Sequence, residues 1–116
     1  MDLDEVRRRV ALWNEHMPSV KIFYAIKANN DRHLLKMMVD SGNCFDCASI
    51  SEIETMLSLG ATPDQIIFAN PCKSEEAIEY AAFKNVRLVV FDCVEELDKM
   101  MDLFPNAELV LRIAVE

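Results

Sequence analysis

Short apolar runs alternate with amphipathic stretches along most of the chain. The runs have the length and the Val, Ile and Phe content of buried strands, and they cover residues 20–26, 44–46, 66–69, 88–91 and 109–114. The stretches between them carry apolar residues at helical spacing, and they cover residues 2–17, 31–41, 51–59, 74–83 and 94–103. The pattern predicts five strands and five helices in alternation.

The spacing of the predicted strands is regular. The second, third and fourth strands each follow the previous one by 22 residues, and the fifth follows by 21. The equivalent positions are Ile22, Cys44, Ile66, Leu88 and Leu109. Strands that alternate with helices form parallel βαβ units with right-handed crossovers. The fold class is therefore α/β, and two architectures fit: a doubly wound open sheet, or part of a (β/α)8 barrel. No Gly-rich turn follows the first strand, which weakens a nucleotide-binding interpretation.

Composition and charge narrow the class of protein. The 116 residues allow one domain at most, and a hydrophobic content of 52% is enough for a buried core. Twelve Lys and Arg against 20 Asp and Glu give a net charge of −8, which argues against nucleic acid or an anionic membrane as partner. No apolar run approaches the roughly 20 residues of a membrane span, and the acidic start lacks the features of a signal peptide. We expect a soluble, cytoplasmic protein.

The four cysteines leave two interpretations open. Cys44 and Cys47 have the C-x-x-C spacing of redox dithiols and of half zinc sites. A zinc ribbon needs a second such pair, however, whereas Cys72 and Cys93 stand alone. We expect reduced, partly buried cysteines and no metal site, with a metal or redox module as the alternative.

Polar residues follow the predicted strands at their carboxyl ends, where parallel α/β proteins gather their chemistry. The first four strands end, in turn, in Lys27, Asp46, Asn70 and Asp92. Arg112 lies inside the predicted fifth strand, where an arginine between apolar neighbours needs an anionic partner. A lysine near a small residue such as Ala25 can form a Schiff base, a carboxylate can move protons, and an arginine can hold an anion.

Several motifs in this order resemble a known family. They are residues 23–29 (FYAIKAN), residues 45–49 (FDCAS) followed by Glu52, residues 68–73 (FANPCK), residues 91–92 (FD) and residues 111–114 (LRIA). Together they resemble the pyridoxal-phosphate-dependent ornithine, diaminopimelate and arginine decarboxylases, whose barrel is like that of alanine racemase, and the ornithine decarboxylases most. The similarity runs from residue 18 to residue 116 without visible gaps.

The resemblance implies a cofactor site and a reaction. Lys27 matches the lysine that binds pyridoxal phosphate through a Schiff base, Ala25 a small residue packed near the cofactor, and Asp46 the acid near the Schiff base. Glu52 matches a second acid of the family motif, and Arg112 an arginine of the cofactor pocket. The implied catalytic residues are Lys27 and Asp46. The implied reaction converts L-ornithine to putrescine and carbon dioxide, a step of polyamine biosynthesis, with pyridoxal phosphate as electron sink.

The resemblance also sets the expected extent of the domain. A complete (β/α)8 barrel takes about 250 residues, so residues 1–116 are expected to form its N-terminal portion, with the rest of the barrel and a C-terminal β domain missing. We expect this portion alone neither to bind pyridoxal phosphate tightly nor to decarboxylate. The full enzymes of the family are homodimers.

Two alternatives remain within the family. One is a decarboxylase for another basic amino acid, because substrate determinants lie downstream. The other is a non-catalytic relative like antizyme inhibitor, although such relatives tend to lose residues that here are Asp46 and Arg112. The segment matching the antizyme-binding region of the animal enzymes, near residues 73–91, carries a more acidic face, formed by Glu75, Glu76 and Glu79.

Overall fold

Five parallel strands form one curved sheet in the order β1-β2-β3-β4-β5, in a computed structural model that describes residues 1–115. The strands are β1 (Phe23–Ala25), β2 (Cys44–Cys47), β3 (Ile66–Phe68), β4 (Leu88–Phe91) and β5 (Glu108–Leu111). The helices are α1 (Leu3–His16), α2 (Arg32–Asp40), α3 (Ile50–Ser58), α4 (Glu75–Phe83) and α5 (Val94–Leu103), with 3-10 turns η1 (Ile26–Ala28) and η2 (Pro63–Gln65). The predicted alternation is confirmed.

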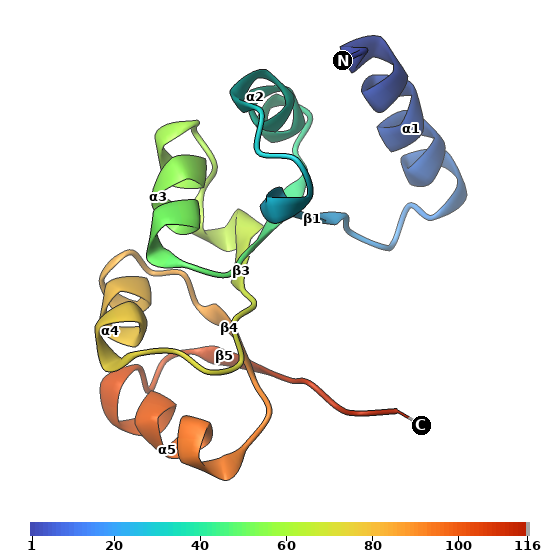
Figure 1. Cartoon of the computed structure of the whole chain (residues 1–116). Coiled ribbons are helices and arrows are strands. Elements are labelled where there is room, and N and C mark those ends of the chain that lie inside the picture. Colours follow the sequence, from blue (N-terminus) through green and yellow to red (C-terminus); the bar gives the residue numbers. More distant parts are fainter. Residues whose placement is uncertain (116) are drawn as a thin grey trace.

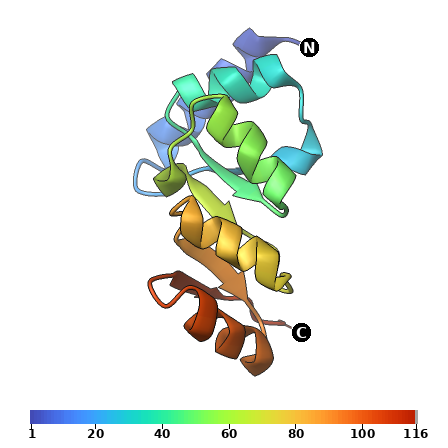
Figure 2. The same cartoon turned by 90° about the vertical axis from the view of Figure 1, so that its left-hand side faces the viewer.

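The strand order decides between the two architectures. In a doubly wound sheet the order reverses at a switch point and helices cover both faces. Here the order follows the sequence throughout, and α2 to α5 lie along one side of the curve, outside the strands (Figure 1). Figure 2 shows the same helices stacked as one layer in front of the strands. The fold is therefore part of a (β/α)8 barrel.

Local side-chain chemistry explains where the helices begin. Asp2 accepts hydrogen bonds from the amide of Asp4 at 3.0 Å, and Asp31 from that of His33 at 3.0 Å. Ser49 and Ser74 cap α3 and α4 in the same way. Each of these side chains satisfies an amide that the first helical turn leaves unpaired.

The helix ends follow an equally local rule. Gly42 and Gly60 take φ values of +78° and +98° immediately after the last turns of α2 and α3. This left-handed conformation ends a helix with little cost for glycine. After Gly42, the amide of Asn43 bonds to the carbonyl of Met38 at 3.1 Å, which closes the last turn of α2. These ends return the chain to the start of the next strand.

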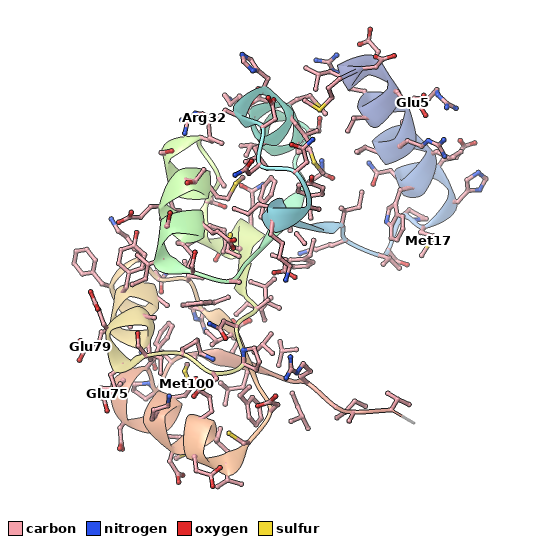
Figure 3. All side chains as sticks on the ribbon, in the orientation of Figure 1. Glu5, Met17, Arg32, Glu75, Glu79 and Met100 are labelled. Carbon is pink, nitrogen blue, oxygen red and sulfur yellow. The ribbon has the colours of Figure 1, made fainter. Side chains whose placement is uncertain are left out.

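The core lies between the helices and the outer face of the sheet. The register pairs Phe45 with Ile66 and Phe68 with Val89, so these side chains share the outer face. All four are at most 1% exposed, and the helices cover them with a second set of buried residues: Leu35, Ile53, Met56, Ile78 and Met100. In Figure 3 the Met100 side chain points from α5 toward the sheet.

The last strand differs from its prediction. It ends at Leu111 rather than at residue 114, so Arg112 is the first residue after the strand and not a member of it. The reason is that β4, the partner strand, ends at Phe91, whose carbonyl accepts the Arg112 amide at 2.8 Å. Leu111 and Ile113 are 57% and 68% exposed, because within residues 1–115 no helix follows β5 to cover them.

The first strand is also shorter than predicted, at Phe23–Ala25 instead of residues 20–26. Ile26 starts the turn η1, so Lys27 lies in that turn rather than at the strand end. No helix within residues 1–115 has both the length and the apolar character needed to cross a membrane.

Candidate functional site

Lys27 is positioned by the turn that follows β1. Ile26, its neighbour in η1, is only 3% exposed and anchors the turn in the core, whereas Lys27 is exposed. The Tyr24 hydroxyl donates to the Asn29 carbonyl at 3.0 Å and so links β1 to the end of the turn. The lysine ammonium is thereby presented at the carboxyl end of the sheet.

Asp46 lies beside this turn on the next strand. It pairs in register with Ala25, which puts both residues on the inner face of the sheet. Asp46 is half-buried, and this burial raises the pKa of its carboxyl, while the charge of Lys27 lowers it and that of Glu52 raises it. The charges of Lys27 and Glu52 therefore both act on the Asp46 carboxyl.

Glu52 is held by the start of α3. Its carboxylate accepts a hydrogen bond from the Ala48 amide at 2.5 Å, and its own amide donates to the Ser49 hydroxyl at 3.2 Å. A hollow of about 310 Å³ separates η1 from α3, and it is lined by Lys27, Glu52 and neighbouring residues: Ile26, Asn30, Arg32, Ser51 and Thr55. The lining of the hollow therefore includes two cationic side chains, Lys27 and Arg32, and the Glu52 carboxylate.

Arg112 does not join this group in the part of the chain that the structure describes. Its guanidinium donates to the Asp92 carboxylate at 2.5 Å, so the predicted anionic partner is Asp92, at the end of β4. The strand β3 lies between this pair and the Lys27–Asp46 group. Asn70, the remaining predicted strand-end residue, accepts the Cys72 amide at 3.1 Å and shapes the turn after β3. Within the described residues, Lys27 and Asp46 therefore lie on neighbouring elements, whereas Arg112 pairs with Asp92 across β3 from them.

Lys73, Glu96 and Lys99 form a buried charged cluster that the sequence patterns do not predict. The Lys73 ammonium, whose side chain is 0% exposed, contacts a Glu96 carboxylate oxygen at 2.9 Å and donates to the carbonyls of Asn70 and Val90, each at 2.7 Å. Lys99 contacts the other Glu96 oxygen at 2.7 Å. The i, i+3 spacing of Glu96 and Lys99 could have indicated their ion pair from the sequence. No sequence pattern indicates Lys73 as a partner, because it lies 23 positions before Glu96.

The C-x-x-C spacing does not bring its two thiols together. Cys44 pairs with Phe23 on the inner face of β2, whereas Cys47 pairs with Phe68 on the outer face. Both are buried, and burial, with Glu52 and Asp46, raises the pKa of the Cys47 thiol to about 12. Residues three apart on a strand point to opposite faces, so this pair cannot share a metal ion or a disulfide.

The acidic residues at the start of α4 face away from the sheet. Figure 3 shows Glu75 and Glu79 on the outer side of this helix. Glu76 is exposed as well. The acidic face expected from the sequence is therefore present at the surface.

The fold and these side chains define a class of protein: a (β/α)8-type barrel domain with a lysine just after β1 and a carboxylate beside it on β2. The chain belongs to the family described as pyridoxal-dependent decarboxylase, pyridoxal binding domain, which residues 3–116 match. The cofactor class implied by the motifs is thereby confirmed at the level of the family.

Individual relatives support this membership. The chain is 46% identical over 115 residues to ornithine decarboxylase of Saccharomyces cerevisiae, and 43% identical over 115 residues to antizyme inhibitor 2 of Xenopus laevis. Each match covers 99% of this chain and 25% of the relative. The crystal structure of the Paramecium bursaria Chlorella virus arginine decarboxylase superposes with a TM-score of 0.92 at 39% identity, over 96% of this chain and 30% of that one. The chain thus spans about a quarter of the length of these curated relatives.

Proposed function

We propose that the protein containing this chain is a pyridoxal-phosphate-dependent decarboxylase that converts L-ornithine to putrescine and carbon dioxide. The observation that carries this proposal is the placement of Lys27, exposed in the turn after β1 and near enough to Asp46 for its charge to lower the pKa of that carboxyl. Ornithine is preferred as substrate because the motifs around Asp46 and Asn70 resemble those of ornithine decarboxylases, and the yeast relative carries that name.

The residues present fit the cofactor. An exposed primary amine is the group that binds an aldehyde covalently, and Lys27 offers one in the turn at the carboxyl end of β1. Ala25, opposite Asp46 in the register, carries only a methyl group, which leaves the inner face open for a planar ring. When bound, pyridoxal phosphate supplies an electron sink for the electron pair left by the departing carboxylate.

The chain's own residues then have distinct tasks. Lys27 would hold the cofactor covalently through Nζ, and as a free amine it would carry protons at the same atom. Asp46 is suited to trade a proton with Lys27, because burial raises the pKa of its carboxyl. Glu52, held by the Ala48 amide, places a negative charge near Asp46 that raises the pKa of the Asp46 carboxyl. Arg112 adds positive charge at the far end of the sheet, where Asp92 holds its guanidinium in place.

The test is a Lys27→Ala variant of the intact protein. We expect loss of carbon dioxide release from L-ornithine, together with loss of covalent cofactor attachment, which borohydride reduction and mass spectrometry locate on the peptide containing Lys27. Lys21→Ala is the matched control, because Lys21 lies just before β1 and its charge acts on the Cys44 thiol instead. Attachment of the cofactor to another lysine would contradict the proposal.

A second candidate function rests on the relative named antizyme inhibitor 2. A non-catalytic protein of this kind would show no decarboxylation of ornithine, arginine or lysine by the unmodified protein. Retention of Lys27, Asp46 and Arg112 favours the enzyme. An antizyme pull-down, with Glu75 and Glu79 exchanged for lysine as a comparison, separates the two functions, because strong antizyme binding without catalysis supports only the second.

A further inference from the structure

Two exposed cysteines lie on neighbouring turns at the carboxyl end of the sheet. Cys72 belongs to the turn after β3, and Cys93 is the residue before α5, two residues after the end of β4. The last register pair of these strands is Phe68 with Val89. Each cysteine follows its member of this pair by four residues in the sequence.

The buried charged cluster clamps the two turns together. The Lys73 amide, next to Cys72, donates to Glu96 at 3.0 Å, and Glu96 lies in the first turn of the helix that Cys93 opens. From the other side, the Lys99 ammonium donates to the Lys73 carbonyl at 2.6 Å. Neither turn can therefore move away from the other without breaking buried hydrogen bonds.

A single cation lies beside both turns. The Lys99 ammonium donates to the Lys73 carbonyl, next to Cys72, and contacts Glu96 in the first turn of α5. Glu96 is the main reason that the pKa of Lys99 is raised, and Cys72 and Cys93 both add to the effect. Disulfide-bonded cysteines have Cα atoms about 4.4–6.8 Å apart, so the bridge requires the two turns to hold their cysteines at that separation.

We propose that Cys72 and Cys93 are a redox-active pair that forms a reversible disulfide on reaction with a peroxide. One thiolate attacks a peroxide oxygen; the S–O bond forms, the O–O bond breaks, and the leaving hydroxide takes up a proton as water. The second thiolate attacks the resulting sulfenic acid, the S–S bond forms, and a second water leaves. Two thiols are oxidised by two electrons in all, and one peroxide is reduced to two waters.

The bridge would act on the part of the sheet where Arg112 is held. Asp92, the partner of Arg112, immediately precedes Cys93. A disulfide at Cys93 therefore fixes the residue next to this ion pair and joins it to the turn after β3. The two cysteines lie on the turns after β3 and β4, whereas Lys27 and Asp46 lie on η1 and β2, so the redox pair stands or falls independently of the decarboxylase proposal.

The experiment exposes the intact protein to stoichiometric hydrogen peroxide, blocks the remaining thiols, and maps disulfides by tandem mass spectrometry. We expect a Cys72–Cys93 crosslink, with loss of two hydrogens, that dithiothreitol reverses. Cys72→Ser and Cys93→Ser each remove one end of the crosslink and should leave a sulfenic acid on the remaining cysteine that dimedone traps.

The matched control is the Cys44→Ser, Cys47→Ser double variant, which removes the two buried thiols and should form the crosslink as before. Circular dichroism of each variant verifies the fold. Oxidation of Cys72 and Cys93 separately, without a bridge, would overturn the proposal. A bridge that involves Cys44 or Cys47 would overturn it as well.

Discussion

At the scale of single residues, the most consequential side chain is one that the motifs do not explain. Lys73 is completely buried. Its ammonium forms an ion pair with Glu96 and donates hydrogen bonds to the carbonyls of Asn70 and Val90. An unpaired buried charge is costly, so every member of this cluster depends on the others. The cluster joins the ends of β3 and β4 to α5, which keeps the rim of the sheet in one shape.

Glu96 provides a pH test of this cluster. Burial opposes its charge, but hydrogen bonds from Lys99 and Lys73 outweigh burial and lower the pKa of Glu96 below its ordinary value of 4.5. A lowered pKa in the folded state means that the unfolded state binds protons first as the pH falls. The stability from Glu96 is therefore fully present above pH 4.5 and is lost as the pH drops through the folded value.

We expect Glu96→Gln to lower the free energy of unfolding by about 3–5 kcal/mol near neutral pH, because Lys73 loses its buried partner. The difference from the unmodified protein should narrow below pH 4.5. Urea denaturation across this pH range measures it. Glu79→Gln, on the exposed side of α4, serves as control and should change stability by less than about 0.5 kcal/mol. A difference that stays constant with pH would contradict the assignment.

At the scale of elements, α1 to α4 each start with a side chain that accepts a hydrogen bond from a free amide of the first turn. The start of α3 matters most for the site, because Ser49 and Glu52 share it: Ser49 accepts the Glu52 amide, and the Glu52 carboxylate accepts the Ala48 amide. The position of the Glu52 charge near Asp46 thus follows from the way the helix begins.

Ser49→Ala should destabilise the protein by about 1 kcal/mol, the usual cost of losing a helix cap. It should also change the pKa of Asp46, since Glu52 contributes to the value. Ser51→Ala is the comparison, because Ser51 lies in the same helical turn and the cap at Ser49 stays intact. Thermal unfolding and carbon-13 NMR titration of the Asp46 carboxyl would measure both effects. Equal behaviour of the two variants would be the contrary result.

At the scale of the whole molecule, the sheet curves with its helices on the outside only. The outer faces of β2, β3 and β4 are sealed by helices, whereas Leu109 and Leu111 of β5 are 41% and 57% exposed. Leu111 pairs with Phe91 and so lies on the outer face. The relatives are about four times as long as this chain, and in a complete (β/α)8 barrel the helix that follows a strand would cover this face of β5.

Leu111→Ala should therefore lower the stability of the intact protein by about 2–5 kcal/mol, the range for truncating a buried leucine. Met101→Ala is the apolar control, because Met101 lies 64% exposed on the solvent side of α5 and should change stability by less than about 0.5 kcal/mol. Chemical denaturation measures both. A Leu111 variant as stable as the control would show that the outer face of β5 stays uncovered.

The elements follow from local chemistry, so they could be predicted. The bounds of β4 and α5 match the prediction to the residue, and the other helices differ by at most one residue at each end. The caps and the left-handed glycines lie within a few residues of the ends that they determine. The proximity of Asp46 on β2 to the segment that carries Lys27 followed as well, because consecutive parallel strands lie side by side and the register pairs Ala25 with Asp46.

The amino-acid sequence by itself therefore determined the order of the elements, the family motifs and the succession of Lys27 and Asp46 near the ends of the first two strands. Only the tertiary structure decided that Lys73 is buried against Glu96, that Arg112 pairs with Asp92 beyond β5, and that Cys72 and Cys93 lie on adjoining turns. The physical reason is range. Hydrophobic periodicity and helix caps act within one or two turns of chain, whereas a buried charge or a shared turn depends on residues about 20 or more positions away.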